Sequence, residues 1–345
     1  MVLCIKQFKD FHDAIKLKEE NATLKEKRDI IINKLKEKLP DKTNYKFSVF
    51  NQGSYAMNTG IKPLGSDYDI DVGLYFEMSK NDVKPVPAKQ WIKDALEGHT
   101  KDIKMKVPCV TVTYQAGYHV DVTVYAATND DDKVYLAKGK PGSLEENKVW
   151  EESNPKDLIK EIRDHLSDEG DRKQFRRIVR YLKRWKDVNF NNGSGKPTGI
   201  ALTSCVYHWL NIQRGIDPFD GKRTYRDLDA LINIVSTMHW NFVDEIVEVD
   251  GEYKSMPRLK VELPVKPYPE LFQKMTPKQM VTFKERLGTL LDKLQEAKDH
   301  SDPTDAAEIL QTQFGSDFPV PPRSTTGLRA SVPPVIPSSE SAVES

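Results

Sequence analysis

Two aspartates in one short apolar segment constrain the fold more than any other feature of this sequence. Asp69 and Asp71 stand on either side of Ile70 within YDIDVGLYF, residues 68–76. The β-branched and aromatic residues of this segment predict a strand. Because side chains alternate along a strand, both carboxylates should lie on one face, with Ile70 and Val72 facing the core. Acids in so apolar a strand require a compensating cation.

A third aspartate lies in a similar segment. Asp121 interrupts YHVDVTVYA, residues 118–126, whose valines alternate on the opposite face. Pairing of this strand beside residues 68–76 would bring Asp121 to the face of the other two acids. Three convergent carboxylates suit Mg²⁺ or Mn²⁺, and two such ions can activate an attacking hydroxyl and stabilise a leaving phosphate oxygen. The alternative is acids on edge strands that prevent aggregation, although such acids are seldom set in segments this apolar.

A glycine-serine turn precedes the two aspartates. Gln52, Gly53 and Ser54 follow an apolar strand-like segment, and SYAMN can then open a short helix with Ser54 as its N-cap. The backbone N–H groups of such a turn favour phosphate, and Gly53 allows close approach of the backbone. Alone, a Gly-Ser pair is more often an ordinary turn.

Composition limits the class of protein. The 345 residues are 38% hydrophobic and 30% charged, with a formal net charge of zero. Neutrality argues against sequence-blind nucleic-acid binding, so we expect no stable DNA or RNA template. We also expect no membrane contact, because no segment reaches the length of a transmembrane helix and the N-terminus lacks the apolar region of a signal peptide. Three scattered cysteines form no disulfide framework, and this predicts a cytoplasmic protein.

Hydrophobic periodicity divides the chain into parts with different secondary structure. Residues 10–39 are predicted to form one long helix. Strand-like segments follow, and residues 107–126 contain a Gly-bearing turn that predicts an antiparallel hairpin. Helical periodicity dominates beyond residue 155, where a strand pair is predicted at residues 244–250 and 258–264.

These patterns predict an α+β protein with a cleft between two lobes. The predicted divisions are a catalytic lobe that includes the N-terminal helix (1–155), a mostly helical lobe (156–322) and a disordered Pro/Ser-rich tail (323–345).

The order of the motifs resembles the polymerase-β-like nucleotidyltransferases. In these proteins a strand, a Gly-Ser turn with a short helix, an Asp-x-Asp strand and a later Asp-bearing strand follow one another. QGSYAMNTGIKPLGSDYDIDVGLYF together with YHVDVTVYA is most similar to the bacterial cGAS/DncV-like nucleotidyltransferases, the cyclic-oligonucleotide synthases of antiphage signalling systems. The resemblance covers about residues 5–322. It implies a polymerase-β-like lobe with a central mixed or antiparallel sheet, a long N-terminal helix and a helical second lobe.

The resemblance also implies an enzyme with assigned roles for its residues. Asp69, Asp71 and Asp121 would be the catalytic residues and would hold two metal ions. A lysine of the basic helix RKQFRRIVRYLKRWK and a serine of the next helix bind the donor triphosphate in the relatives. The nucleotide-binding residues implied here are Gln52, Gly53, Ser54, Lys183 and Ser204. Cys205 stands where some relatives have an aromatic residue that stacks on the base.

The implied reaction is attack of a ribose hydroxyl on the α-phosphate of a nucleoside triphosphate, repeated until a cyclic product closes. ATP is the expected substrate, with GTP or a pyrimidine nucleoside triphosphate as the other, and proteins of a defence operon are the expected regulatory partners. Two alternatives remain open. One is an RNA-tailing or linear oligonucleotide-making transferase, for which we find no appended RNA-binding module. The other is a non-catalytic scaffold of the same fold.

Overall fold

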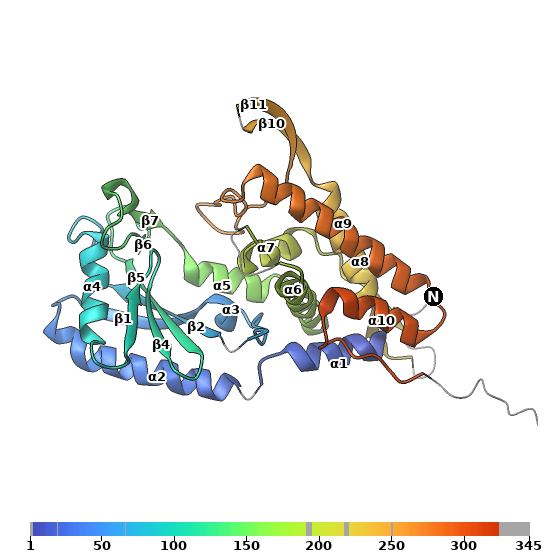
Figure 1. Cartoon of the computed structure of the whole chain (residues 1–345). Helices are drawn as coiled ribbons and strands as arrows, with labels where there is room; N and C mark the ends of the chain where they lie inside the picture. Colours follow the sequence, from blue (N-terminus) through green and yellow to red (C-terminus); the bar gives the residue numbers. More distant parts are fainter. Residues whose placement is uncertain are drawn as a thin grey trace, which may run out of the picture.

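The computed structural model describes residues 3–18, 20–65, 67–190, 195–216, 221–249 and 251–323. Two lobes lie side by side, one built on a mixed β-sheet and the other made mainly of helices (Figure 1). Apart from Arg323, the predicted disordered tail lies outside the described residues. Within the described part of the chain, no helix combines the length and the apolar character needed to cross a membrane.

The sheet of the first lobe is mixed. Its main strands follow the order β1-β2-β5-β4-β3, with β2 and β5 parallel and the other pairs antiparallel. Short strands β6 and β7 extend it from β5. The strand bounds are β1 Phe47–Gln52, β2 Tyr68–Phe76, β3 Asp102–Met105, β4 Val110–Tyr114, β5 Tyr118–Ala126, β6 Tyr135–Ala137 and β7 Trp150–Glu152. The predicted β4–β5 hairpin is confirmed.

Two helices cover one face of this sheet. Helices α2 (Glu20–Lys38) and α4 (Pro85–Ala95) share a buried cluster with alternate residues of β2 and β5, among them Ile70 and Val122. Valine and isoleucine on this face explain why these segments form central strands, since their branched side chains pack well on a pleated surface. The opposite face of β2 and β5 is left for the aspartates.

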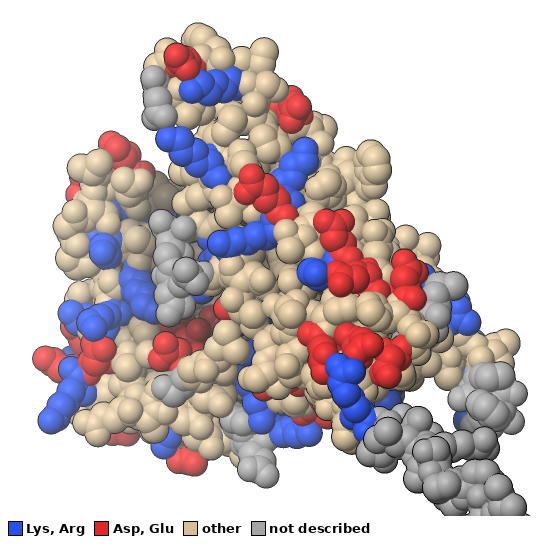
Figure 2. Space-filling view, turned by 45° about the vertical axis from the view of Figure 1, so that its right-hand side comes forward, with Lys and Arg blue, Asp and Glu red and all other residues tan. Residues whose placement is uncertain are grey.

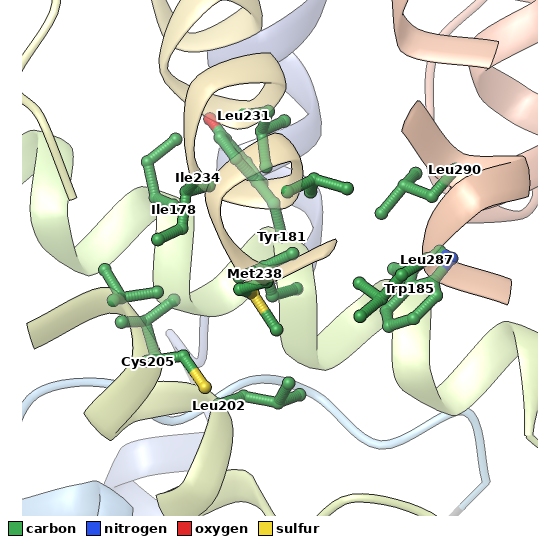
Figure 3. Packing of buried hydrophobic residues seen from close by; sticks show 14 of the residues in the cluster. Ile178, Tyr181, Trp185, Leu202, Cys205, Leu231, Ile234, Met238, Leu287 and Leu290 are labelled. Carbon is green, nitrogen blue, oxygen red and sulfur yellow. The ribbon is translucent and has the colours of Figure 1, made fainter. Parts of the chain in front are cut away.

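The second lobe packs around α6 (Glu169–Asn189). Figure 3 shows Tyr181 and Trp185 of this helix among apolar side chains of α7, α8 and α9. Asp168 caps its N-terminus by accepting a hydrogen bond from the backbone N–H of Asp171. The remaining helices of the lobe are α5 Pro155–Asp164, α7 Gly199–Trp209, α8 Asp227–Trp240, α9 Pro277–Asp299 and α10 Pro303–Phe314.

The prediction of a single N-terminal helix is wrong, because the structure has two helices. Helix α1 (Ile5–Ile15) ends before α2 begins, and Lys16 between them forms a β-bridge with Ile61. The two helices serve different cores: buried side chains of α1 pack in the helical lobe, and those of α2 pack under the sheet. The sequence pattern places the whole N-terminal segment with the first lobe, but α1 belongs by its contacts to the second.

The helical lobe also contains two hairpins. Strand β10 (Val243–Val249) pairs with β11 (Glu252–Arg258), whereas the sequence pattern predicts the second strand at residues 258–264. The tight turn at Gly251, with φ of +80°, places the return strand earlier in the chain. The other hairpin joins β8 (Arg214–Ile216) and β9 (Arg223–Tyr225). The shortest helical elements are η1 Leu39–Asp41, α3 Gly53–Ala56 and η2 Glu145–Asn147.

Candidate active site

The three predicted carboxylates meet on one face of the sheet. In the parallel register of β2 and β5, Asp71 lies opposite Asp121 and Asp69 lies opposite His119. The expected pairing of these two strands is therefore confirmed. Asp69 is exposed, and Asp71 and Asp121 are half-buried.

Few hydrogen-bond donors face the three carboxylates, so their negative charges are poorly compensated. Burial raises the pKa of Asp71 to about 7, and the neighbouring charges of Asp121 and Asp69 add to the shift. Partial desolvation, followed by the charge of Asp121, raises the pKa of the largely exposed Asp69 as well. The hydroxyl of Thr111 donates to Asp121, and the Nζ of Lys106 lies 3.9 Å from Asp121 Oδ1. The carboxylates repel one another as long as no cation lies between them.

The chemistry of these donors fits a hard divalent cation. Mg²⁺ and Mn²⁺ prefer carboxylate oxygens, and a bound cation would reverse the repulsion that raises the pKa of the aspartates. In the described part of the chain, no three acidic, histidine or cysteine side chains converge closely enough to form a finished metal site. The carboxylates would therefore have to close around an ion, and the metal-binding role remains a prediction.

Gly53 lies directly against Asp71. Its φ is +66°, and a Cβ atom built on Gly53 would lie 1.8 Å from Asp71 Oδ2. The close approach follows from the β1–β2 register, in which Gln52 pairs with Asp71. Only glycine satisfies both the backbone conformation and the space.

The side chain of Gln52 is engaged within the sheet. Its Nε2 donates to Thr123 Oγ1 at 2.9 Å, and its Oε1 accepts a hydrogen bond of 2.9 Å from the hydroxyl of Tyr125. These bonds fix the end of β1, where the turn begins. Ser54 does not cap the short helix as predicted, because α3 already begins at Gly53.

Lys183 reaches the loop that follows α3 from the helical lobe. Its Nζ donates to the carbonyl oxygen of Thr59 at 3.0 Å and to the Thr59 hydroxyl at 3.2 Å. Burial lowers the pKa of Lys183 to about 7, with Lys186 and Arg180 as the next causes. Gly199 at the start of α7 leaves room for the lysine, since a Cβ there would lie 3.3 Å from Lys183 Cε.

A cavity of about 970 Å³ opens between the lobes at this site. Ser54 and Asp69 line it from the sheet lobe, and Lys183, Lys186 and Lys196 line it from the helical lobe. A smaller cavity of about 290 Å³ adjoins it and is bordered by Gln52, Gly53, Ser54, Lys183 and Thr203. Sequence reasoning missed Lys186 and Lys196. The spacing of Lys186 from Lys183 was an available signal, because residues three apart share one helix face.

Ser204 is the one predicted nucleotide-binding residue that the structure does not bring to these cavities. It lies in the middle of α7 with its side chain fully buried, and its Oγ has no hydrogen-bond partner among the described residues. Gly199, Ile200 and Thr203 of the same helix border the smaller cavity instead. On a helix with 3.6 residues per turn, positions 199, 203 and 200 follow one another over about 100°, and position 204 lies about 40° beyond position 200, on the side buried in the lobe.

Comparison with known proteins agrees with this geometry. Residues 47–125, which hold β1, the Gly53 turn and all three aspartates, match the family described as "Cyclic GMP-AMP synthase DncV-like, nucleotidyltransferase domain". Residues 47–125 therefore form a DncV-like nucleotidyltransferase domain. A cyclic GMP-AMP synthase of Escherichia albertii is 30% identical over 52% of this chain and 41% of its own length. A c-di-GMP synthase of Roseivirga ehrenbergii is 21% identical over 78% of the chain and 72% of its own length.

Solved structures share the whole fold of this chain. A Vibrio cholerae di-nucleotide cyclase (DncV) mutant in complex with ATP and GTP has a TM-score of 0.66 at 16% identity, covering 92% of this chain and 96% of the other. The Bradyrhizobium diazoefficiens CD-NTase CdnG in complex with GTP also has a TM-score of 0.66 at 16% identity, covering 90% and 94%. At this identity the likeness establishes the α+β fold. The alignment to the E. albertii enzyme spans less than half of that protein.

Proposed function

We propose that this chain is a template-independent nucleotidyltransferase that joins nucleoside triphosphates into a cyclic oligonucleotide second messenger and releases pyrophosphate. The observation that carries the proposal is the β2–β5 register, which sets Asp69, Asp71 and Asp121 beside the Gly53 turn and a cavity lined by lysines. The named relatives are synthases of cyclic dinucleotides. We propose that the product of this chain acts in antiphage signalling.

The chain's own residues divide the work between binding and positioning. Asp69, Asp71 and Asp121 would hold Mg²⁺ or Mn²⁺, which makes a ribose hydroxyl a better nucleophile and neutralises the leaving pyrophosphate. The triphosphate would lie along Ser54 and Lys183. An anion there would favour the charged form of Lys183, whose amine is otherwise desolvated by burial. Gln52 would act by fixing the turn, and Ser204 by packing.

The cavity is large enough for a second nucleotidyl transfer. Its volume of about 970 Å³ is at the upper end of ordinary ligand pockets, so both a donor triphosphate and an acceptor can be accommodated. A linear product that reverses its direction in this space would present its free hydroxyl to the same aspartates. We propose ATP as one substrate, with GTP or a pyrimidine nucleoside triphosphate as the other.

The decisive experiment is incubation of the protein with labelled nucleoside triphosphates and Mg²⁺, without template, followed by phosphatase. We expect a phosphatase-resistant product that is lost in the Asp69→Asn and Asp71→Asn variants. Products that stay phosphatase-sensitive or require an RNA primer would replace the proposal with a linear or tailing transferase. Absence of any transfer, with or without candidate partner proteins, would favour a scaffold.

The charge on one face of the molecule favours small substrates over long RNA. Acidic and basic side chains are interspersed on the face shown in Figure 2, without a broad basic stripe. A stripe of that kind is what backbone-tracking binders of single strands use.

A further inference from the structure

A second, strongly basic cavity lies away from the aspartates, where α1, α6 and β9 meet. Its volume is about 820 Å³, and seven Lys and Arg residues line it against two Asp residues. This local excess of positive charge contrasts with the chain as a whole, whose formal net charge is zero. Ile5 and Phe8 supply an apolar wall.

The positive charge of this basic cavity is only partly neutralised from within the protein. Arg177 is paired with Asp227 at 2.6 Å, and Arg223 lies 3.2 Å from Asp168. Arg176 has only a loose contact with Glu169, at 3.7 Å. Lys9, Lys16 and Arg180 form no ion pair with a carboxylate among the described residues, so no partner neutralises their positive charges there.

Arg180 is the most unusual of these cations because it is almost completely buried. Its guanidinium donates to His12 Nε2 at 3.0 Å and to the backbone carbonyls of Asn58 and Gly60. The same environment lowers the pKa of His12 to about 4, by burial first and then by Arg180 and Arg177. His12 is therefore neutral at physiological pH and leaves the positive potential of the arginine in place.

We propose that this basic cavity is a binding site for a small anion that carries two or more linked phosphate groups. A single carboxylate would balance one of the cations, whereas a diphosphate or triphosphate matches several. Guanidinium forks and ammonium groups on facing elements, α1 and α6, suit phosphate oxygens spread along a chain. The buried Phe8 on one side of the cavity reduces screening by solvent.

The site is also connected to the active site through one loop. Arg180 binds the carbonyls of Asn58 and Gly60, and Lys183, one helical turn further along α6, binds Thr59 between them. An anion that engages Arg180 thus acts on the loop that Lys183 holds at the Gly53 turn. This binding site is independent of whether the proposed transfer reaction is correct.

The experiment is calorimetric titration of the full chain with inorganic tripolyphosphate in EDTA and about 150 mM NaCl, conditions that suppress metal-dependent and non-specific binding. We expect saturable binding that weakens about tenfold or more in a Lys9→Gln/Arg176→Gln variant. A Lys254→Gln/Lys260→Gln variant removes the same charge from the β10–β11 region and should bind like the wild type. Citrate, with similar charge, should bind more weakly if linked phosphates are what the cavity recognises.

Two results would overturn the proposal. One is the absence of saturable binding by the wild type. The other is binding that is unaffected by Lys9→Gln/Arg176→Gln but lost in Lys186→Gln, which would place the anion in the active-site cavity. Hydrogen exchange locates the ligand independently of activity: protection should occur at residues 5–16, 57–61 and 172–181 rather than at residues 183–187 and 196–200.

Discussion

The contact between Gly53 and Asp71 decides whether the candidate active site can assemble. Glycine is required there for two separate reasons, a left-handed backbone and the carboxylate 1.8 Å from the position of a Cβ atom. The left-handed backbone alone costs about 1 kcal/mol for a non-glycine residue. The clash with the carboxylate would displace Asp71, a proposed metal ligand.

We therefore expect Gly53→Ala to abolish nucleotidyl transfer, with a loss of at least about a hundredfold from displacement of one positioned group. Gly98→Ala is the matched control, since Gly98 also has a positive φ, of +72°, but no atom lies within 4 Å of the point where its Cβ would stand. Both variants should remain folded in urea titrations, with the larger loss of stability in Gly53→Ala, and only Gly53→Ala should lose activity. Equal activity of the two would show that Asp71 need not occupy its observed position.

The clustering of Asp71 with Asp69 and Asp121 predicts a pH-dependent cost to stability. The folded-state pKa of Asp71 is raised from 3.8 to about 7. Between these values the unfolded chain binds fewer protons than the folded chain, so stability falls as pH rises through this window. At pH 8 without metal, Asp71→Asn should therefore be more stable than the wild type by about 1–3 kcal/mol.

Thermal unfolding in EDTA and in excess Mg²⁺ tests this expectation. Mg²⁺ should raise the midpoint of the wild type and have little effect on Asp71→Asn. Asp292→Asn changes the same charge on the surface of α9, away from the aspartate cluster, and should behave like the wild type in both conditions. A variant that is less stable than the wild type at pH 8 in EDTA would contradict the proposed repulsion.

Among the elements, the strands of the site were predictable and the helices around it were less so. YDIDVGLYF and YHVDVTVYA set their aspartates between apolar residues, and the period of two fixes which residues share a face. Helix α7 gives no such signal, since residues 201–206 are all buried and its apolar character continues around the helix. Its rotation depends on neighbours that the sequence does not reveal, so the buried position of Ser204 could not be predicted from the sequence.

The break between α1 and α2 is hidden from the sequence for a similar reason. Residues on both sides favour a helix, so local preference predicts one continuous element. The interruption comes from tertiary structure, because α1 and α2 pack on different cores and Ile15 receives a hydrogen bond from Lys62. The β10–β11 turn, in contrast, carries a local signal, since Asp250-Gly251 is a typical hairpin dipeptide.

Helix α1 should stabilise the helical lobe through its aromatic residues. The ring of Phe11 stacks on Tyr181 of α6 with centroids 5.2 Å apart and also contacts Phe314 and Phe318. We expect Phe11→Ala to cost about 3–5 kcal/mol in urea unfolding. Ile5→Ala, at a position of α1 that is 45% exposed, should cost no more than about 0.5 kcal/mol. A small effect of Phe11→Ala would mean that α1 is not part of the helical core.

In the whole molecule, α6 joins the two lobes by holding the loop between α3 and β2. Arg180, Lys183 and Arg184 bind backbone carbonyls of this loop at Asn58, Thr59, Gly60 and Lys62. The same loop follows the Gly53 turn and leads into the strand of Asp69 and Asp71. The relative placement of Lys183 and the carboxylates thus depends on bonds from side chains to carbonyls, which no sequence pattern reveals.

Arg184 offers the most direct test of this connection, because it joins three parts of the chain. Its Nη2 donates to the carbonyl of Lys62 at 2.9 Å and lies 3.2 Å from Asp317 Oδ2, beyond α10. We expect Arg184→Met to increase amide hydrogen exchange in residues 57–65 about tenfold, the effect of losing one charge-assisted hydrogen bond. Exchange within β2 and β5 should not change, since their backbone pairing is independent of Arg184.

Arg172→Met provides the matched control on the same helix. Arg172 also donates to backbone carbonyls, those of Leu166 and Ser167, but these lie just before α6 and not in the loop between the lobes. Its loss should increase exchange only near residues 166–169. If both variants affected residues 57–65 equally, the effect would reflect general loosening of α6. If neither did, the loop would be held by Arg180 and Lys183 alone, and the lobes would be joined by two cations rather than three.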